Sequence, residues 1–489
     1  MNPRPMQSFK ARLNLKAGTL VCASLLTGAV IAGDPAQKRT VAAALKPGGE
    51  WKDYPTRILD DLPSSASAKI DSGLSTFGGW PIKRENATGF FRVKKIQDRW
   101  WLIDPEGCLF LHRGVASVRT TPTPGASAAL KDKFGSHEGW AQQTVALLRQ
   151  NGFNGLGAWS DSEALRGVAR PVVYTRLWNF MAAYGKKRGG TFQQPGHTGY
   201  PGDCIFVFDP AFETFCDEYA RQLAATKNDP WLLGHFSDNE MPLPHDALRN
   251  YLNLPARDAG REAAWDWLRK RHGAQARIEA ITEADLQEFQ ALVVDRYFSL
   301  VARAIRKYDP NHLYLGARLH GADLRYPAIF RACGRNVDAV SVNYYHAWTP
   351  DPERLEMWER ESGKPILITE WYAKGADSGM ANTGGAGWLV KTQRDRGLFY
   401  QNFALALLES RVCIGWDWFR YMDNDPADTR VDPSNRDSNK GIVNNRYQPY
   451  LPLLDAMKQL NDRVYSLTEF FDRRAQPQAG VSAPAKSKD

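Results

Sequence analysis

The sequence predicts an α/β protein whose main domain is a (β/α)8 TIM barrel with an N-terminal β-hairpin extension and enlarged βα loops. The first observation is that short β-rich runs alternate with amphipathic helical segments over roughly 310 residues. The second is that no Gly-rich phosphate-binding turn follows any of these runs, which disfavours the alternative, a doubly wound open sheet. The predicted strands are residues 109–117, 155–159, 172–178, 232–238, 313–319, 339–344, 365–369 and 412–418.

The segments between the predicted strands carry helical patterns. The clearest amphipathic helices are predicted over residues 139–151, 211–226, 285–307 and 392–409. Consecutive strands are separated by enough chain for a crossover helix, which is the connection that parallel strands require. We therefore expect the strands to run parallel, with their carboxyl ends at one rim of the barrel.

The chain before the first predicted strand divides at about residue 88. Residues 34–88 carry scattered Gly, Pro and Ser without a long strand pattern, so we expect a leader packed on the outside of the barrel. Residues 89–473 are expected to form the main domain, which opens with a hairpin. Its two short strands flank a turn at Gln97-Asp98, and a second turn at residues 104–107 leads into a third strand.

Both ends of the chain are expected to lie outside the folded domain. Residues 1–33 have a basic start, an apolar run over residues 17–32 and small residues after it, which is typical of a secretory signal peptide. We therefore expect an exported protein, periplasmic or extracellular, that is free of the membrane after signal removal; a retained anchor is the alternative. Residues 474–489 are dominated by Gln, Pro, Ala, Ser and Lys and are expected to be a disordered tail.

The composition narrows the functional classes. Basic residues are interleaved with acidic ones, so no nucleic-acid partner is expected. Beyond Cys22 the cysteines are widely spaced and form no CxxC pair, which predicts neither a disulfide framework nor a zinc site. There is no HExxH or GxSxG motif, so we expect no metal and no cofactor, with calcium at the acidic stretch 423–432 as the alternative. No feature of the sequence indicates an oligomeric state.

Two glutamates end predicted strands. Glu240 follows the fourth strand and Glu370 follows the seventh. Reactive groups of a TIM barrel lie at the carboxyl ends of its strands, so these carboxylates would face each other across the barrel mouth. Cleavage of a glycosidic bond needs such a pair, one protonated to assist the leaving oxygen and one ionised to attack the anomeric carbon. The alternative for either glutamate alone is a rim ion pair with Arg or Lys.

The pair Asn239-Glu240, taken with Glu370, resembles the large clan of retaining TIM-barrel glycosidases that includes β-galactosidases, β-glucuronidases, mannanases and agarases. The resemblance implies that Glu240 is the acid/base, that Glu370 is the nucleophile and that Asn239 binds the 2-hydroxyl of the sugar. It also implies a carbohydrate as the substrate.

Other strand ends complete the set of residues expected to bind substrate. Asn343 and Tyr345 share strand parity, which favours Tyr345 over Tyr344 as the partner of Glu370. Arg318 and His320 also share parity, with a paired rim arginine and a surface histidine as the alternative. The remaining members are Arg113, in an Arg-Gly-Val strand that resembles the clan's, then Trp371, and Trp416 and Trp418, which would form an indole floor beneath the sugar.

Two further features are expected near the rim. Trp159 and Trp178 end the second and third predicted strands and are candidates for stacking on sugar rings, against the alternative of loop packing. The loop 374–387 is rich in Gly, Ala and Ser and follows Glu370 closely. It predicts a mobile lid, or alternatively a long surface loop.

Within the clan, the chain is most similar to bacterial agarase-like proteins. The likeness rests on residues 234–240 (GHFSDNE), 369–375 (TEWYAKG) and 439–443 (NKGIV), and it extends over residues 89–471. It implies a retaining O-glycoside hydrolase that cleaves a β-linked galactan by double displacement. The alternatives are a β-galactosidase, mannanase or glucuronidase of the same clan, or a carbohydrate-binding barrel without catalysis.

Overall fold

The computed structural model describes residues 39–66, 73–431 and 435–475. The predicted signal peptide and nearly all of the predicted C-terminal tail lie outside these ranges; residues 474 and 475 are the last residues of a helix. None of the helices in the described ranges is long and apolar enough to cross a membrane. Export of the protein and the boundaries of its domains remain predictions.

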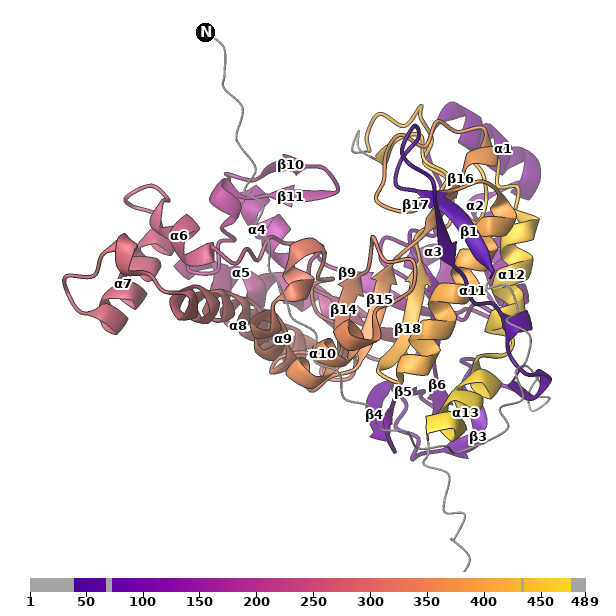
Figure 1. The fold of residues 1–489 in the computed structure, drawn as a ribbon, viewed down its shortest axis with the longest axis horizontal. Coiled ribbons are helices and arrows are strands. Elements are labelled where there is room, and N and C mark those ends of the chain that lie inside the picture. Colours follow the sequence, from indigo (N-terminus) through magenta and orange to yellow (C-terminus); the bar gives the residue numbers. More distant parts are fainter. Residues whose placement is uncertain (1–38, 67–72, 432–434, 476–489) are drawn as a thin grey trace, which may run out of the picture. The chain divides into compact units, whose positions relative to one another are not determined.

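The largest sheet contains eight strands, all parallel, and every predicted barrel strand contributes one of them. Their order in the sheet is β13-β12-β9-β8-β7-β18-β15-β14 (Figure 1). The strands are β7 (His112–Val115), β8 (Gly155–Leu156), β9 (Val173–Leu177), β12 (Leu232–Phe236), β13 (Leu313–Tyr314), β14 (Val340–Asn343), β15 (Ile366–Glu370) and β18 (Cys413–Trp418). The crossover connections therefore place all their carboxyl ends at one edge, as predicted.

The prediction of a single regular TIM barrel is nevertheless wrong. The sheet is open, with ends at β13 and β14, and these two strands share only an isolated bridge between Leu319 and Val342 instead of a ladder. β13 stops after two residues because Gly316 and Arg318 have φ of 82° and 50°, outside the extended region that a ladder needs. The described chain also forms three further sheets, of which the predicted hairpin accounts for part of one.

The three smaller sheets lie around the parallel one. The predicted hairpin is present as β4 and β5, with Gln97 at a positive φ in its turn, and β6 follows as the third strand. The strands that residues 34–88 add to these sheets were not predicted. The small sheets comprise β3 (Trp80–Arg84), β4 (Arg92–Ile96), β5 (Arg99–Ile103) and β6 (Cys108–Phe110); β1 (Thr40–Ala44), β2 (Lys52–Pro55), β16 (Ala373–Gly375) and β17 (Trp388–Val390); and the hairpin of β10 (Phe192–Gln194) and β11 (His197–Gly199).

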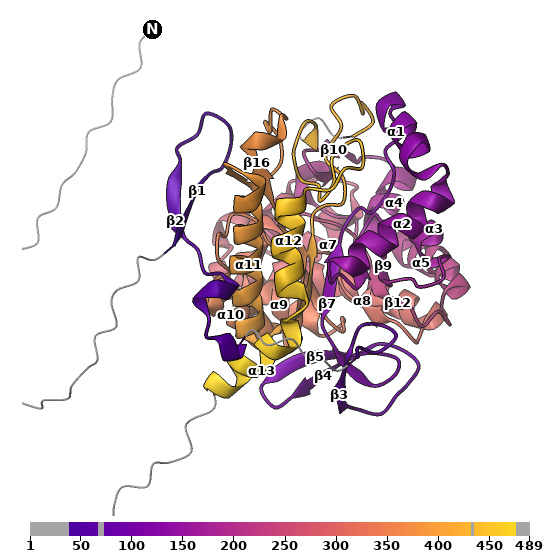
Figure 2. The ribbon, with the colours of Figure 1, turned by 90° about the vertical axis from the view of Figure 1, so that its right-hand side faces the viewer.

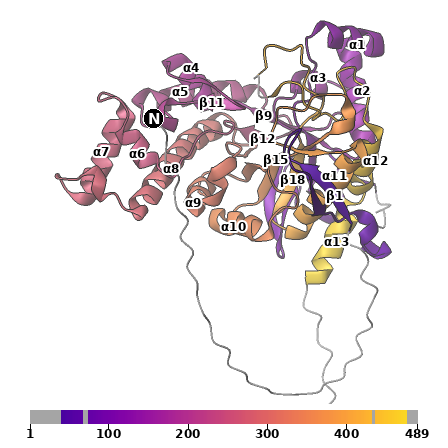
Figure 3. The ribbon, with the colours of Figure 1, turned by 45° about the horizontal axis from the view of Figure 1, so that its top comes forward.

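Helices fill the connections between the strands. The longest, α8 and α11, begin with capping boxes in which Thr282 and Asp285, and Thr392 and Asp395, satisfy the free N–H groups of the first turn. The helices are α1 (Pro124–Phe134), α2 (His137–Gln150), α3 (Ser162–Arg166), α4 (Phe180–Arg188), α5 (Pro210–Ala220), α6 (Ala247–Leu252), α7 (Ala259–His272), α8 (Glu283–Tyr308), α9 (Pro327–Gly334), α10 (Pro352–Ser362), α11 (Gln393–Ser410), α12 (Leu451–Asn461) and α13 (Val464–Ala475). Figure 2 shows α11 and α12 side by side, and Figure 3 shows α6 and α7 beside α8.

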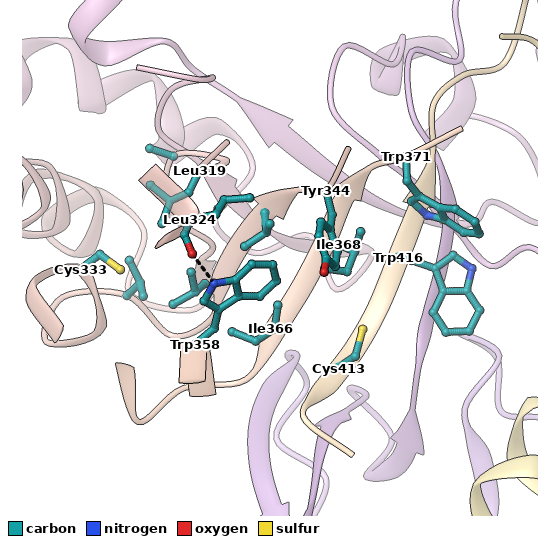
Figure 4. Packing of buried hydrophobic residues seen from close by; sticks show 14 of the residues in the cluster. Leu319, Leu324, Cys333, Tyr344, Trp358, Ile366, Ile368, Trp371, Cys413 and Trp416 are labelled. Atoms are coloured by element: carbon teal, nitrogen blue, oxygen red, sulfur yellow. Dashed lines mark hydrogen bonds between the residues drawn. The ribbon is translucent and has the colours of Figure 1, made fainter. Parts of the chain in front are cut away.

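The core between the parallel sheet and its helices is rich in aromatic rings (Figure 4). Trp358 of α10 is fully buried and donates its indole N–H to the carbonyl of Leu324 at 2.9 Å. Trp371 stacks on Phe403 with ring centroids 4.3 Å apart. Such large buried rings contribute strongly to stability, because their removal leaves cavities that the surrounding structure fills only in part.

Candidate active site

A cavity of about 750 Å³ opens at the carboxyl ends of the parallel strands. This is the edge at which ligands bind in parallel α/β sheets. Of the residues predicted to act on substrate, Asn239, Glu240, His320, Tyr345 and Glu370 line the cavity. The two glutamates, which are distant in sequence, thus border one space that is large enough for sugar rings.

Glu370 ends β15 and is 5% exposed. Its Oε2 accepts a hydrogen bond of 2.5 Å from the hydroxyl of Tyr345, and its Oε1 forms a 2.9 Å ion pair with Arg318. Strand alternation predicts Tyr345, rather than Tyr344, beside Glu370, and the structure has this contact. One carboxylate oxygen is therefore held by a phenol and the other by a guanidinium.

A β-bulge sets the position of Glu370. Val342 of β14 is paired with Ile368, but the next residue, Asn343, is paired with Glu370, so that Thr369 is the extra residue. A bulge of this kind shifts the side chains that follow it relative to the strict alternation of the strand. The bulge brings Glu370 and Asn343 into register at the cavity.

Glu240 follows β12 and is 9% exposed. Its Oε1 accepts a hydrogen bond of 2.8 Å from the side-chain amide of Asn343. On the other oxygen, Oε2, the nearest basic group is His197 Nδ1 at 4.0 Å. Glu240 therefore has a neutral donor where Glu370 has a cation and a phenol.

A polar network joins the two glutamates and fixes the amide orientations. Arg318 can only donate, so the Asn239 atom at 2.6 Å from its Nη1 is Oδ1. Asn343 lies 3.3 Å from the same oxygen and must present Nδ2 there, which leaves its Oδ1 to accept from the Thr369 hydroxyl at 2.7 Å. The amide N–H group of Asn239 is consequently left for a ligand in the cavity.

Burial raises the pKa of both glutamates, and their other neighbours act unequally. For Glu370, the charge of Arg318 and the hydrogen bond from Tyr345 oppose the rise, whereas the charge of Glu240 adds to it. For Glu240, the hydrogen bond from Asn343 and the charges of Arg318 and Lys440 oppose the rise. The direct ion pair favours the ionised form at Glu370, and a charge there disfavours a second charge at Glu240.

Several residues at this edge have a left-handed backbone. Ser117, Trp159, Glu240 and His346 follow β7, β8, β12 and β14, respectively, and have φ of 55°, 59°, 51° and 61°. Bulky residues rarely adopt this conformation, and such strain gathers at functional sites, where the surrounding structure holds it in place. All four line the cavity, and no sequence pattern signals their conformation.

Two histidines lie near Glu240. Burial and the charge of His197 lower the pKa of His320 to about 4, while Glu370 opposes this effect, so His320 is neutral at pH 7. Its Nδ1 is buried without a hydrogen-bond partner in the described part of the chain. His320 therefore offers the cavity a neutral polar group. The ring of His197 lies beside it, with ring centroids 5.3 Å apart, and His197 was not among the predicted site residues.

Four predicted substrate-binding residues lie away from the cavity, which corrects their placement. Trp416 and Trp418 are buried behind the sheet and donate their indole N–H groups to Tyr400 OH and to the carbonyl of Lys440. Trp371 belongs to the same aromatic core (Figure 4). Arg113 is buried and binds the carbonyls of Gly152 and Leu111. Strand alternation explains why Arg113, Trp416 and Trp418 point away from the cavity. Their neighbours in β7 and β18 occupy the opposite, inner face of the sheet: His112, Gly114, Gly415 and Asp417.

Trp159 is the indole that the structure places at the site. It lines the 750 Å³ cavity and also an adjoining cavity of about 630 Å³, which Trp178 borders. The guanidinium of Arg318 lies 4.2 Å from the centroid of the Trp159 ring. Both rings border a cavity, and their stacking on sugars remains a prediction.

The loop that follows Glu370 is tied down by a buried lysine. Lys374 Nζ donates to the carbonyls of Asn382, Gly384 and Gly385 at 3.4, 3.0 and 3.2 Å. Gly385 and Ala386 line the cavity. The loop therefore forms part of the cavity wall.

One wall of the cavity carries positive charge that the sequence analysis missed. We define this cationic wall as Arg119, Arg420, Arg430 and Lys440, all of which line the cavity. Arg430 is paired with Asp428 at 2.9 Å, and Lys440 donates to Asn435 Oδ1 at 2.5 Å. For Arg119 and Arg420, the available signal was their position shortly after β7 and β18, since residues that follow the strands reach the site.

Two clusters have side chains of the kinds that bind metals. His197, Glu240 and His320 each offer an atom within 4.8 Å of the others, as do His235, Asp309 and His312. In the second cluster both histidines bind Asp309 at 2.8 Å, so the three residues satisfy one another. Asp432 of the acidic stretch 423–432 lies outside the described residues; within the described part, Asp423 accepts hydrogen bonds from Asn439, Gly441 and Tyr450.

The chain is similar to several known proteins, although no protein-family model matches it. It is 26% identical over 534 residues to beta-agarase B of Vibrio sp. (strain JT0107), a match that covers 86% of this chain and 54% of that protein. The chain thus spans about half the length of this curated relative.

Solved structures match as well. The structure of BpGH50 has a TM-score of 0.78 and 29% identity, covering 89% of this chain and 96% of the other. The structure of an exo-beta-agarase has a TM-score of 0.67 and 21% identity, with coverage of 84% and 72%, and shows likeness of fold alone.

Proposed function

We propose that this chain is a retaining glycoside hydrolase that cleaves β-linked galactan of the agar type. The observation that carries the proposal is the pair of buried carboxylates, Glu240 and Glu370, on one sugar-sized cavity with unequal hydrogen-bond and charge partners. The likeness to beta-agarase B supports the activity and the substrate class, and the likeness to BpGH50 supports the fold.

Glu370 is assigned as the nucleophile. A nucleophilic carboxylate must be ionised while the other glutamate holds a proton. The ion pair with Arg318 and the phenolic hydrogen bond from Tyr345 both stabilise the charged form of Glu370. Attack of Glu370 on the anomeric carbon would give a covalent glycosyl-enzyme, with Tyr345 keeping the second oxygen in place.

Glu240 is assigned as the acid/base. Burial raises the pKa of Glu240 and so favours its protonated form. An ionised Glu370 on the same cavity would favour that form further, because two like charges close together disfavour each other. In the first step Glu240 would give its proton to the leaving oxygen, and in the second it would take a proton from the water that hydrolyses the intermediate. The hydrogen bond from Asn343 can persist through both steps, because its amide N–H can donate to the carboxylate and to the protonated carboxyl group of Glu240.

Asn239 is assigned as the ligand of the sugar 2-hydroxyl. Its Oδ1 is occupied by Arg318 and Asn343, so its N–H group points to the cavity as a donor. A hydrogen bond to the 2-hydroxyl that strengthens in the transition state contributes several kcal/mol, about two or more tenfold steps in rate. Trp159 would stack on the apolar face of a neighbouring sugar.

The proposal is tested by incubating the protein with agarose, carrageenan, mannan and an unsubstituted β-galactan, and reading the products by mass spectrometry and NMR. We expect new reducing ends from agarose, with the β-configuration retained in the first product formed. Activity on mannan alone would overturn the substrate class, and an α-anomer as the first product would overturn the double displacement. Binding of agarose without any new reducing end would favour a carbohydrate-binding protein.

A further inference from the structure

Arg420 is a buried cation whose side chain has no hydrogen-bond or ion-pair partner among the described residues. It follows β18, lines the cavity and is 7% exposed. Its side chain forms no hydrogen bond and no ion pair with the part of the chain that the structure describes, and its Nε is fully buried. Buried guanidinium groups nearly always have acceptors, because an unsatisfied buried charge costs several kcal/mol.

The described carboxylates whose charges act on Arg420 are Asp423, Asp428 and Glu370, and all three are already engaged. Asp423 accepts from Asn439, Gly441 and Tyr450 at 2.9, 2.8 and 2.6 Å. Asp428 is paired with Arg430, and Glu370 is paired with Arg318. None of them pairs with Arg420, so its guanidinium group borders the cavity without a carboxylate partner in the described ranges.

A second cation makes this arrangement still less favourable without a ligand. Arg119 lines the same wall; its side chain is exposed and forms no hydrogen bond or ion pair within the described ranges. Burial and then the charge of Arg119 lower the pKa of Arg420 to about 10, partly offset by Asp423 and Glu370. Arg420 therefore remains charged at pH 7, beside a like charge.

We infer that Arg420, with Arg119, binds an anionic substituent of the sugar chain, either a sulfate ester or a carboxylate. Planar guanidinium groups bind such oxyanions through two parallel hydrogen bonds, and these charged bonds are stronger than neutral ones. The inference rests on the proposed function and adds to it that the substrate is a charged galactan. The cavity then has one wall for bond cleavage and one for the substituent.

The competing explanation is that Arg420 only helps to keep Glu370 ionised. In that case its loss would lower activity equally on all substrates and move the acidic limb of the pH profile upward. Binding of a substituent instead predicts a loss that depends on the substrate. The two explanations therefore separate when charged and neutral substrates are compared at several pH values.

The first experiment measures kcat/KM on three galactan oligosaccharides of equal length: neutral, sulfated and carboxylated. We expect the wild-type protein to prefer one of the charged forms by about tenfold or more, and Arg420→Gln to lose most of that preference. Arg394→Gln, which removes an exposed charge from α11, is the matched control and should keep the preference. The form preferred identifies sulfate or carboxylate as the ligand. No preference in the wild type, or an equal loss on all three, would overturn the inference.

The second experiment does not depend on hydrolysis. Inorganic sulfate at millimolar concentration, compared with chloride at equal ionic strength, should raise the Tm of the wild type and of Arg394→Gln by about 2 °C more than that of Arg420→Gln. An identical shift in all three variants means an adventitious ion only and counts against the wall. If the sulfate shift depends on Arg420 but no galactan is cleaved, the proposed hydrolysis fails while the anion site stands.

Discussion

The two walls of the cavity differ in how completely their polar groups are satisfied. On the wall built by β12, β14 and β15, Glu370 and Asn343 have their partners inside the protein at 2.5–2.9 Å. On the cationic wall, Arg420 and Arg119 have none among the described residues. A preorganised set of dipoles stabilises developing charge without reorganisation. A buried cation without an acceptor, such as Arg420, can instead gain one from a ligand. The first wall is thus suited to catalysis and the second to recognition.

Loss of the proposed nucleophile should have the largest effect. Glu370→Gln keeps the shape of the side chain but cannot form the covalent intermediate, so kcat should fall by at least about 10³-fold on every substrate. Steady-state rates on neutral and sulfated oligosaccharides measure this. Folding, followed by circular dichroism, and sugar binding should be retained. A near-normal rate on any galactan would show that Glu370 is not the nucleophile.

Loss of the proposed acid/base should have the next largest effect, and it should depend on the leaving group. Glu240→Ala should lower kcat by about 10²–10⁴-fold on oligosaccharides, and much less on aryl glycosides whose leaving groups need no proton. Azide fits the space left by the carboxylate and should partly restore the rate, giving a β-glycosyl azide. Equal losses on good and poor leaving groups would refute the assignment.

Loss of Arg318 should show in the pH profile. Arg318 opposes the rise in the pKa of Glu370, so Arg318→Gln should raise that pKa. Glu370 would then ionise only at higher pH, and the acidic limb of kcat/KM should move upward by about one unit or more. At the optimum we expect a loss of about tenfold to 100-fold, since Asn239 also loses its partner. An unchanged acidic limb would mean that Arg318 acts on packing alone.

The smallest effect on activity is expected at a tryptophan of the core. Trp371→Phe should lower the free energy of unfolding by about 1–3 kcal/mol because the indole packs on Phe403 and Tyr400. Its kcat/KM should change by less than about threefold, whereas Trp159→Ala should weaken binding by about tenfold through lost stacking. Urea unfolding and substrate KM measure the two effects. A large rise in KM for Trp371→Phe would restore it to the substrate site.

Much of this architecture can be predicted from local sequence pattern. All the predicted barrel strands are present because short β-rich runs and intervening amphipathic helices encode parallel strands with crossovers. The position of Glu240 and Glu370 followed from the same pattern, since each ends a run. The prediction of a closed regular barrel was wrong because Gly316 and Arg318 end the ladder of β13 early. The pattern of apolar residues does not reveal the positive φ values that cause this.

The errors at the site have physical causes of the same kind. Trp416 and Trp418 were assigned to the cavity by resemblance, although Asp417 between them occupies the inner face of the sheet with His112. The bulge at Thr369 breaks the strand alternation just before Glu370. Neither strand parity nor resemblance alone therefore predicts which side chains reach the cavity. Arg420 was not predicted as a site residue, because its lack of a hydrogen-bond or ion-pair partner among the described residues can be seen only in the three-dimensional contacts.

The most direct test of the account is to trap the covalent intermediate. The protein is incubated with an activated 2-deoxy-2-fluoro-β-galactoside, which slows both steps but leaves formation of the glycosyl-enzyme faster than its hydrolysis. Mass spectrometry of proteolytic peptides should then find the label on Glu370, and the label should be absent from Glu370→Gln. A label on Glu240 would reverse the roles of the two glutamates, and turnover without any covalent adduct would contradict double displacement at this site.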